Sequence, residues 1–378
     1  MINRYSIGRL WLLIAMGTLF ACGRNPADVI NRALATRSPF PDRSSSVAFG
    51  VRTIGGPEEI QWLDNDRVLF VGYKVLESKT SDGAKPEVEP LPAIYIWNVR
   101  SNTYERHASL PPRWFICFNR GFIAYATEQR PDGGPRAWRA GMLGHEEPVP
   151  DEIATNEKAL KPCLGWPREE PRVEDPTAVA ISLAPEDGYI KIGEGPRLDD
   201  AVTPENQDTP VELVRPGANG SIALPIWKKE MQGLAPMRFS KFADKYVLVP
   251  RYARSHKNYR AHTPWPHDEP IPIYLISHDG RVEVVELPAG SPIPYGAYPT
   301  RRGLLWASNN APTGNSRQAG AWLLDHGRVQ KIFDHMVSAI GVSPDGCKVA
   351  YAVNDYDRST IDVVHLMNLC GAEEGGEQ

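Results

Sequence analysis

The sequence predicts an all-β fold, and both its composition and its recurring hairpin segments point that way. The 378 residues include 35 Pro and 32 Gly, which disfavour long helices and require frequent turns. From residue 60 onward, short apolar or alternating segments are separated by turns rich in Asp, Asn and Gly. This pattern is typical of antiparallel strands. We therefore expect a chain built mainly from short strands and tight turns.

The clearest hairpin lies near the C-terminus. An apolar segment at 337–342 precedes a Ser-Pro-Asp-Gly turn at 343–346, and an alternating segment follows at 348–353. Proline presets φ for the first corner of a turn, and glycine tolerates the positive φ that closes it. The two segments should therefore pair antiparallel, with a third strand at 361–367.

The same arrangement recurs in weaker form along most of the chain. Six units follow one another at spacings of roughly 40 to 60 residues, a repeat length typical of β-propellers, whose four-stranded blades bury their faces against their neighbours. The fourth strand of the second unit is expected between residues 146 and 176. The other expected strands are 60–63, 67–73, 93–99 and 103–107; 114–118, 121–127 and 137–143; 178–183, 188–192, 211–214 and 221–226; 238–242, 245–250, 271–277 and 281–287; 297–300, 303–307, 321–324 and 328–333; 337–342, 348–353 and 361–367.

The sixth unit has only three strands of its own. Segment 47–54 alternates well enough to form a strand, and as the fourth strand it would close the ring and remove the edges that an open sheet exposes. We therefore predict a β-propeller at 47–370 with six four-stranded blades, closed by the N-terminal strand; five to seven blades are compatible with the pattern. The alternative fold is an irregular pair of β-sandwiches.

One segment carries a family resemblance. The sequence Val-Ser-Pro-Asp-Gly-Cys-Lys-Val-Ala-Tyr at 342–351 resembles the turn that recurs in TolB-type and WD-repeat-like propellers. Only the last unit carries this motif, whereas the corresponding places at 63–67 and 118–121 are degenerate. The resemblance implies a propeller architecture for residues 47–370 and implies nothing about the ligand.

The N-terminus has the pattern of an export signal. Arg4 and Arg9 precede an apolar stretch at 10–21, which gives a charged region and then a hydrophobic region of secretory-signal length. A stretch this short does not comfortably cross a bilayer, which takes about 20 apolar residues. The sequence Leu-Phe-Ala-Cys-Gly at 19–23 resembles a bacterial lipobox, in which a small residue precedes the Cys that becomes lipidated.

The lipobox resemblance implies that residues 1–21 are removed and that Cys22 is diacylated. Acyl chains contribute roughly 0.8 kcal/mol per buried methylene, so several chains anchor a protein stably in a membrane. In lipoproteins of this type, Arg24 in place of Asp implies sorting to the outer membrane, here facing the periplasm of the bacterial envelope. Residues 22–46 are then expected to be a flexible tether and 371–378 a disordered acidic tail. The alternative is an ordinary cleaved signal with an incidental Cys.

Charge argues against nucleic acid as a partner. The chain carries 42 Lys and Arg against 46 Asp and Glu, a formal net charge of −4. Two of the Arg and none of the acids lie in the signal segment, so the remainder is more acidic still. A protein with this balance has no general affinity for polyanions. The expected membrane contact is therefore the N-terminal lipid.

Four cysteines remain after the lipobox, and an oxidising compartment permits them to form two disulfides. Cys347 begins one strand and Cys370 follows its expected hairpin partner, so these two should lie close together. We expect this pair first, which leaves Cys117 and Cys163 as the second pair. The alternative is isolated buried thiols. The sequence has no paired Cys-x-x-Cys spacing for zinc or redox chemistry.

A long connection in the fourth unit carries the candidate binding residues. Three long connections, at 74–92, 253–270 and 309–320, are expected on one face of the propeller, where long insertions commonly form binding surfaces. Segment 251–269 combines aromatic, cationic and imidazole side chains, which can stack on a flat or sugar-like ligand, hold a carboxylate or ligate a metal. The alternative is a solvated surface loop. The candidate residues are Arg254, His256, Tyr259, Arg260, His262, Trp265 and His267.

The sequence assigns no catalytic residue, metal or cofactor. The three histidines of segment 251–269 lack the helical spacing of a zinc site, and the chain has no GxSxG, P-loop, GxGxxG or HExxH motif. Acidic pairs at 169–170 and 199–200 lie in Pro-punctuated polar stretches, where solvated surface is the simpler interpretation. His278 and His326 sit beside Asp-Gly corners and are expected to be turn residues rather than bases.

Two functions remain open on these grounds. The first is an envelope-anchored lipoprotein whose propeller acts as a binding or scaffolding module for another envelope protein or a glycan. The alternative is a propeller-type hydrolase or lyase that acts on carbohydrate or peptide at the mouth of the central channel. The second function requires several His, Asp or Glu side chains to converge in a pocket.

Overall fold

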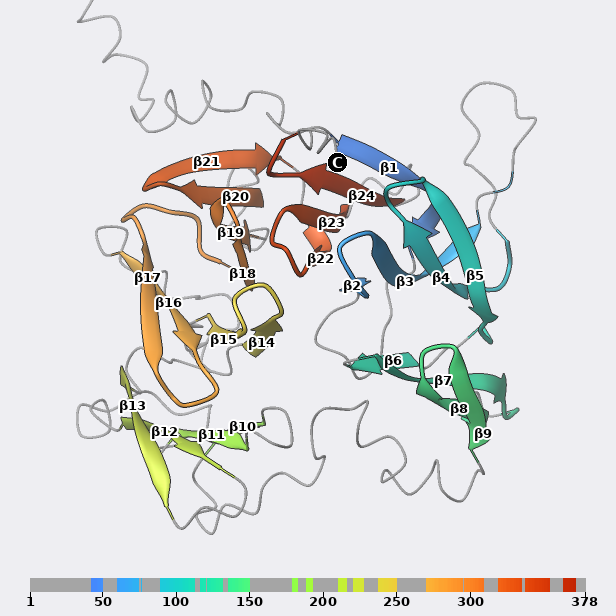
Figure 1. Cartoon of the computed structure of the whole chain (residues 1–378), viewed down its shortest axis with the longest axis horizontal. Coiled ribbons are helices and arrows are strands. Elements are labelled where there is room, and N and C mark those ends of the chain that lie inside the picture. Colours follow the sequence, from blue (N-terminus) through green and yellow to red (C-terminus); the bar gives the residue numbers. More distant parts are fainter. Residues whose placement is uncertain are drawn as a thin grey trace, which may run out of the picture.

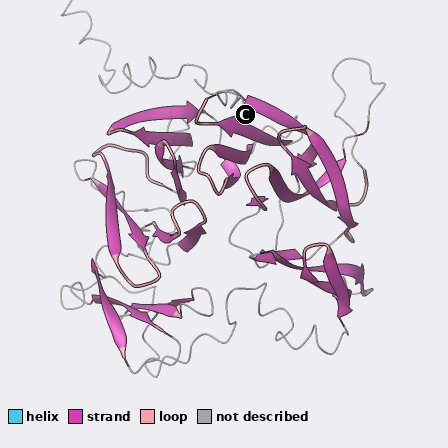
Figure 2. Cartoon of the chain, in the orientation of Figure 1, coloured by secondary structure: helices cyan, strands magenta, loops and turns pink. Residues whose placement is uncertain are grey.

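The computed structural model describes the chain in segments, and all regular structure in these segments is β-strand, with no helix (Figure 2). No helix within them is therefore long and apolar enough to cross a membrane. The described residues are 42–49, 60–74, 76, 89–112, 116–119, 121–131, 135–149, 179–182, 188–192, 210–215, 220–227, 237–249, 270–294, 296–308, 319–334, 337–353 and 363–371.

The described strands form five antiparallel sheets, four of which have four strands each in chain order. These four sheets are β6 (Ile116–Asn119), β7 (Phe122–Gln129), β8 (Pro135–Met142) and β9 (His145–Val149); β10 (Val179–Ser182), β11 (Tyr189–Ile192), β12 (Pro210–Val214) and β13 (Ser221–Trp227); β14 (Met237–Ser240), β15 (Lys245–Leu248), β16 (Ile271–Ile276) and β17 (Val282–Leu287); and β18 (Gly296–Thr300), β19 (Gly303–Ser308), β20 (Gly320–Asp325) and β21 (Arg328–Phe333).

The fifth sheet has eight strands and combines the two ends of the chain. Its order is β22-β23-β24-β1-β3-β4-β5, and β2 pairs with β3 beside this path. Its strands are β1 (Asp42–Phe49), β2 (Ile60–Trp62), β3 (Arg67–Lys74), β4 (Ala93–Asn98), β5 (Thr103–Ser109), β22 (Val337–Val342), β23 (Lys348–Val353) and β24 (Val363–Asn368).

The sheets follow one another around a common centre (Figure 1). In that view the first strand of each group, such as β14, β18 or β22, lies nearest the centre, and the last, such as β17 or β21, lies outermost. From β2 onward the strands agree with the sequence prediction to within a few residues. This agreement includes the faint third unit, now β10 to β13, and β9 lies at the beginning of the stretch 146–176, where the fourth strand of the second unit was expected.

The N-terminal strand joins the first and last groups, as the missing fourth strand of the last unit predicted. β1 pairs antiparallel with β24, with Asp42 opposite Met367, and its end pairs with β3, with Val47 opposite Lys74. Its bounds correct the predicted 47–54, because the strand begins at Asp42 and ends at Phe49. The register with β24 extends the ladder toward the N-terminus, through residues whose polarity gave no strand signal. Residues 42–46 therefore belong to the sheet rather than to the predicted tether.

The hydrophobic core lies between neighbouring groups of strands. Each of the five buried clusters combines residues from two adjacent groups of strands; for example, Leu323 of β20 packs in one cluster with Val349 and Tyr351 of β23. The same holds where the chain ends meet, since Ala350 of β23 clusters with Trp97 of β4. This arrangement is what sheets stacked around a ring require, because each sheet buries its faces against its neighbours.

The predicted turn at 343–346 is confirmed. The Gly346 amide donates to Ser343 O at a distance of 2.8 Å. Gly346 has a φ of +74°, which glycine adopts without strain. Asp345 Oδ1 accepts from the amide of Cys347 at 3.0 Å. The predicted disulfide between Cys347 and Cys370 is also present, with a Cα to Cα distance of 5.2 Å.

Candidate functional site

The two ends of the strands carry connections of different length. The short-turn face is the end where the first strand of each group turns into the second, and the third into the fourth. The long-connection face is the opposite end, where the second strand leads to the third. The short connections are 63–66, 99–102, 120–121, 143–144, 183–188, 215–220, 241–244, 277–281, 301–302, 326–327 and 343–347, and the connections opposite are 75–92, 130–134, 193–209, 249–270, 309–319 and 354–362.

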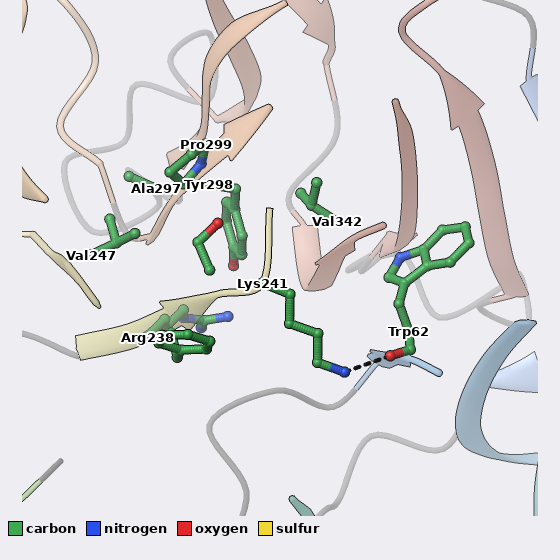
Figure 3. A pocket seen from close by; sticks show the side chains of 10 residues that line it. Trp62, Arg238, Lys241, Val247, Ala297, Tyr298, Pro299 and Val342 are labelled. Carbon is green, nitrogen blue, oxygen red and sulfur yellow. Dashed lines mark hydrogen bonds between the residues drawn. The ribbon is translucent and has the colours of Figure 1, made fainter. Parts of the chain in front are cut away.

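A pocket opens near the short-turn face, where the innermost strands β2, β14, β18 and β22 end (Figure 3). The enclosed space is small, about 20 Å³, and the pocket is partly open to solvent. Four groups of strands, including the first and the last of the chain, therefore build one site around the common centre. The lining residues are Trp62, Arg238, Phe239, Ser240, Lys241, Val247, Ala297, Tyr298, Pro299 and Val342.

Trp62 is fixed in this pocket by a close approach of two inner strands. Its indole Nε1 donates to Gly341 O of β22 at 2.9 Å, and the side chain is buried. A Cβ at position 341 would lie 2.6 Å from Ile60 O, so only glycine permits this spacing between β2 and β22. The close approach of the β2 and β22 backbones at Gly341, together with the hydrogen bond to Gly341 O, therefore sets the position of the indole ring.

Lys241 spans the pocket from the opposite wall. Its Nζ donates to Trp62 O at 2.7 Å, the bond drawn as a dashed line in Figure 3. The lysine belongs to the turn 241–244 between β14 and β15. Since Trp62 itself is held by β22, this hydrogen bond ties the β14 end to the β2 and β22 ends.

Neighbouring turns of the same face also contact one another. The Arg301 amide donates to Gly346 O at 2.9 Å. Phe242 packs so closely on Gly346 that a Cβ there would lie 2.6 Å from Phe242 Cδ2. The turns at 241–244, 301–302 and 343–347 therefore meet at one point.

A further set of bonds links the turn at 343–347 to the turn at 63–66. Lys348 Nζ donates to Asp66 Oδ1 at 2.7 Å and to Asn65 O at 3.0 Å. The Asp345 amide donates to Asn65 Oδ1 at 2.9 Å. The short-turn face is therefore held together by polar contacts among four groups of strands.

An ion pair reinforces this face at its outer side. Arg302 Nε donates to Asp325 Oδ2 at 3.1 Å, and His326 Nδ1 lies 2.5 Å from Asp325 Oδ1. Burial by itself would raise the pKa of Asp325, but the hydrogen bonds from Arg302 and His326 outweigh it and lower the pKa below the usual value. The carboxylate is therefore held ionised as part of the scaffold.

The chemistry of the pocket is cationic and aromatic. The Arg238 guanidinium lies over the Tyr298 ring at 5.1 Å from its centroid, a cation–π contact that orients the cation. Among the described lining residues, Arg238 and Lys241 are basic and none is acidic or a histidine. Such a lining can bind a small anion or a flat apolar group, but it contains no general base.

The predicted binding residues Arg254, His256, Tyr259, Arg260, His262, Trp265 and His267 all lie outside the described residues, as do Cys22 and Cys163. Cys117 lies on β6, and its side chain is not described.

The two histidines expected in turns do lie in turns. His326 has a φ of +49° in the turn 326–327, and His278 lies in the turn 277–281 beside Asp244 at 3.4 Å. No group of three or more His, Cys, Asp or Glu that could hold a metal occurs in the part of the chain that the structure describes.

Sequence reasoning missed the pocket residues. Trp62, Arg238 and Tyr298 each look like an ordinary strand residue, and they are brought together only by the arrangement of the inner strands. The one available signal was the basic pair Arg238 and Lys241, on or just after a predicted innermost strand.

Comparison of the sequence with protein-family models and with curated proteins gives no match. Solved structures with a similar fold include a chain of the mitotic checkpoint complex (9% identity, 88% of this chain and 95% of that chain covered, TM-score 0.41). A catalytically inactive virginiamycin B lyase from Staphylococcus aureus with quinupristin is also similar (10% identity, 87% of this chain and 99% of that chain covered, TM-score 0.39). An oligogalacturonate lyase in complex with manganese is similar as well (10% identity, 88% of this chain and 97% of that chain covered, TM-score 0.35).

These neighbours are β-propeller-like folds, and the present chain is an all-β protein of similar appearance. At TM-scores below 0.5 the likeness carries no argument about what the chain binds or does.

Proposed function

We propose that this chain is a lipid-anchored protein of the bacterial envelope whose β-propeller binds or scaffolds a partner. The lipobox-like sequence at 19–23 supports attachment through Cys22 after removal of residues 1–21. Two or more acyl chains are enough for stable membrane binding. Arg24 favours the outer membrane, with the propeller in the periplasm.

The propeller of this proposal has six four-stranded blades. The four separate sheets supply four blades, and the eight-stranded sheet supplies two, β2 to β5 and β22 to β24 with β1. The pairing of β1 with β24 supports closure by the N-terminal strand. Closure of this kind leaves no long exposed edge between the first and last blades.

The difference between the two faces is the observation that carries the binding function. Hydrogen bonds tie the short turns of one face into a rigid platform, as at Arg301 and Gly346. All but one of the connections opposite are longer than any of these turns, and long connections on a rigid scaffold commonly carry recognition. The longest of them, 249–270, contains the aromatic, basic and imidazole residues singled out from the sequence. We assign this segment as the contact for another envelope protein or a glycan.

Binding is favoured over the hydrolase or lyase alternative by the composition of the pocket. Acid or base catalysis needs a carboxylate, imidazole or similar group within hydrogen-bond reach of the reacting atoms. The described lining of the pocket offers Arg238, Lys241, Ser240 and Tyr298 but no carboxylate or imidazole. Its residues are suited to holding a ligand.

Metabolic labelling with a clickable fatty acid tests the anchor. We expect label on the wild type and on a Gly23→Ala control, and none on Cys22→Ala, which should also be released from membranes by a salt wash. A label that survives in Cys22→Ala, or a wild type without label, would refute lipidation.

Affinity capture from the native envelope tests the binding face. One bait is the wild type, a second has residues 253–270 replaced by a short Gly-Ser linker, and a matched control has residues 311–318 replaced in the same way. We expect the partner to be captured by the wild type and by the control but lost from the first replacement. Equal recovery with all three baits would exclude segment 253–270 as the contact.

A further inference from the structure

We propose that the segment 150–178, which joins β9 to β10, packs on an apolar face of the sheet formed by β6 to β9 and is attached there by a disulfide between Cys117 and Cys163. This attachment involves neither Cys22 nor segment 253–270. Its failure and the failure of the proposed binding function are therefore distinguishable.

One junction between neighbouring groups of strands differs from the others. The five buried clusters each fill a junction between two neighbouring groups. Among the described residues, no such cluster joins the sheet of β6 to β9 to the sheet of β10 to β13, although the two follow one another around the centre (Figure 1). Apolar surface at this junction therefore needs a partner other than the described strands.

The sheet of β6 to β9 carries apolar residues on both faces. One face contributes the buried Ile123 and Tyr125 to the cluster shared with β3 and β4. Successive residues of a strand point to opposite faces, so the residues that alternate with these belong to the other face. The pairing of β7 with β8 places Phe122, Ala124, Ala126, Trp138, Ala140 and Met142 on that other face.

The described sheet across the junction offers this face no apolar surface in return. Glu212 and Ala223 pair with each other on the side of β12 and β13 opposite the buried Leu213, and Ala223 is exposed. Met142 is 54% exposed, whereas Ala124 in the middle of the apolar face is fully buried although it belongs to none of the five clusters. The apolar face is therefore suited to a further layer of chain.

The segment that leaves this face is its most direct occupant. Val149 ends β9 on the same face, opposite Trp138, and residues 150–178 lead from there to β10. The middle of this segment, at 159–166, reads Ala-Leu-Lys-Pro-Cys-Leu-Gly-Trp, an apolar stretch within a connection otherwise rich in Pro and charge. Packing the two together removes apolar surface of both from water, which is favourable.

Cys117 supplies a point of attachment on the sheet. It pairs with Ala124 in the ladder between β6 and β7, so position 117 belongs to the same face. β6 lies three strand spacings from β9, about 14 Å. The stretch 150–163 can extend by roughly 3.3 Å per residue, so Cys163 reaches β6 with ample slack.

The chemistry of the bond is that of the disulfide already present. The bond between Cys347 and Cys370 requires a compartment in which disulfides form. The thiols of Cys117 and Cys163 give up two protons and two electrons as their S–S bond forms. A disulfide-bonded oxidant of that compartment takes them up by thiol–disulfide exchange and is reduced to a dithiol.

Peptide mapping without reduction tests the attachment. The full chain is purified from an oxidising compartment, and its free thiols are blocked at lysis. In most molecules we expect one pair of peptides joined through Cys117 and Cys163, beside the pair joined through Cys347 and Cys370. Blocked thiols at positions 117 and 163, or a bond from either to a different cysteine, would overturn the attachment.

Photocrosslinking tests the packing. Met142→p-benzoylphenylalanine places a probe at the exposed position of the apolar face. The matched control is Ile222→p-benzoylphenylalanine, because Ile222 is 40% exposed and pairs with Leu213 on the face of its sheet that packs toward β15 and β16. We expect irradiation to join position 142 to residues 150–178 of the same chain, and the control to give no such product. A product with a second copy or another protein, equal yields from both probes, or no product from position 142 would each overturn the proposal.

Discussion

Gly346 shows at the scale of a single residue how the short-turn face constrains the sequence. Its φ of +74° disfavours any other residue, and an added Cβ would lie 2.6 Å from Phe242 Cδ2 and 2.8 Å from Arg301 N. We expect Gly346→Ala to lower the free energy of unfolding by roughly 2 to 4 kcal/mol, the combined cost of the left-handed backbone and of overpacking. Urea unfolding measures this loss.

Gly327→Ala is the matched control for that experiment. Gly327 has a φ of +77° in a comparable short turn, but nothing lies within 4 Å of its added Cβ. Only the backbone term, about 1 to 2 kcal/mol, should appear there. Equal losses at the two positions would show that the contact of Gly346 with Phe242 and Arg301 contributes nothing.

The surroundings of a single carboxylate, Glu146, make the free energy of unfolding depend on pH. Its carboxylate lies on β9, accepts from the Gly144 amide at 2.8 Å and contacts His107 Nε2 of β5 at 2.9 Å. Burial would raise its pKa, but the amide hydrogen bonds and His107 outweigh this and lower the pKa from its usual value of 4.5. Tyr125 and Arg139 are the other ionisable groups beside it.

Because the folded pKa of Glu146 is below the unfolded one, the ionised carboxylate contributes stability that is fully present above about pH 4.5 and is lost as the pH falls through the folded pKa. We expect Glu146→Gln to cost about 1 to 3 kcal/mol at pH 7 and progressively less below pH 4.5. Denaturant unfolding across pH 3 to 7 measures this. The exposed neighbour provides the control Glu147→Gln, which should change stability by less than about 0.5 kcal/mol. A constant difference across the pH range would contradict the prediction.

At the scale of elements, the disulfide joins the two ends of the hairpin formed by β23 and β24. Cys347 and Cys370 are 23 residues apart, and closing a loop of this length stabilises the folded state by about 3 kcal/mol in the chain-entropy account. We expect the double variant Cys347→Ser, Cys370→Ser to lose about that much in urea unfolding. The wild type with a reducing agent should behave in the same way. An unchanged wild-type midpoint after verified reduction would contradict this.

Strands and turns are the part of this molecule that the sequence predicts best. The apolar, aromatic-rich run at 93–98 and the Pro and Gly of the turn at 343–346 are local signals, and local signals set hairpins. The start of β1 was predicted wrongly because Asp42 to Ser46 join the sheet through pairing with β24, a contact between residues more than 300 positions apart. The pocket could not be predicted for the same reason, since the bond from Trp62 to Gly341 spans 279 residues.

At the scale of the whole molecule, the first and last groups of strands form one sheet through β1. Val47 is 3% exposed, and β1 occupies the edge that β24 would otherwise present to solvent. This connection between the two ends of the chain depends on a single strand near the N-terminus. A truncation that removes this strand therefore endangers the sheet that joins the first and last groups.

Deletion of β1 tests that dependence. A variant that starts after Phe49 loses the burial of Val47 and a full ladder of backbone hydrogen bonds, whereas a control that starts at Asp42 keeps both. Both are directed to the same oxidising compartment by the same cleaved signal. We expect the shorter variant to be less stable by about 3 kcal/mol or more, because one fully buried Val accounts for about 1.5 to 3 kcal/mol before the hydrogen bonds are counted. The exposed edge of β24 should also drive self-association, detected by light scattering after size-exclusion chromatography. Equal stability and a monomeric state in both variants would show that β1 is dispensable and that the first and last groups of strands hold together through their own contacts.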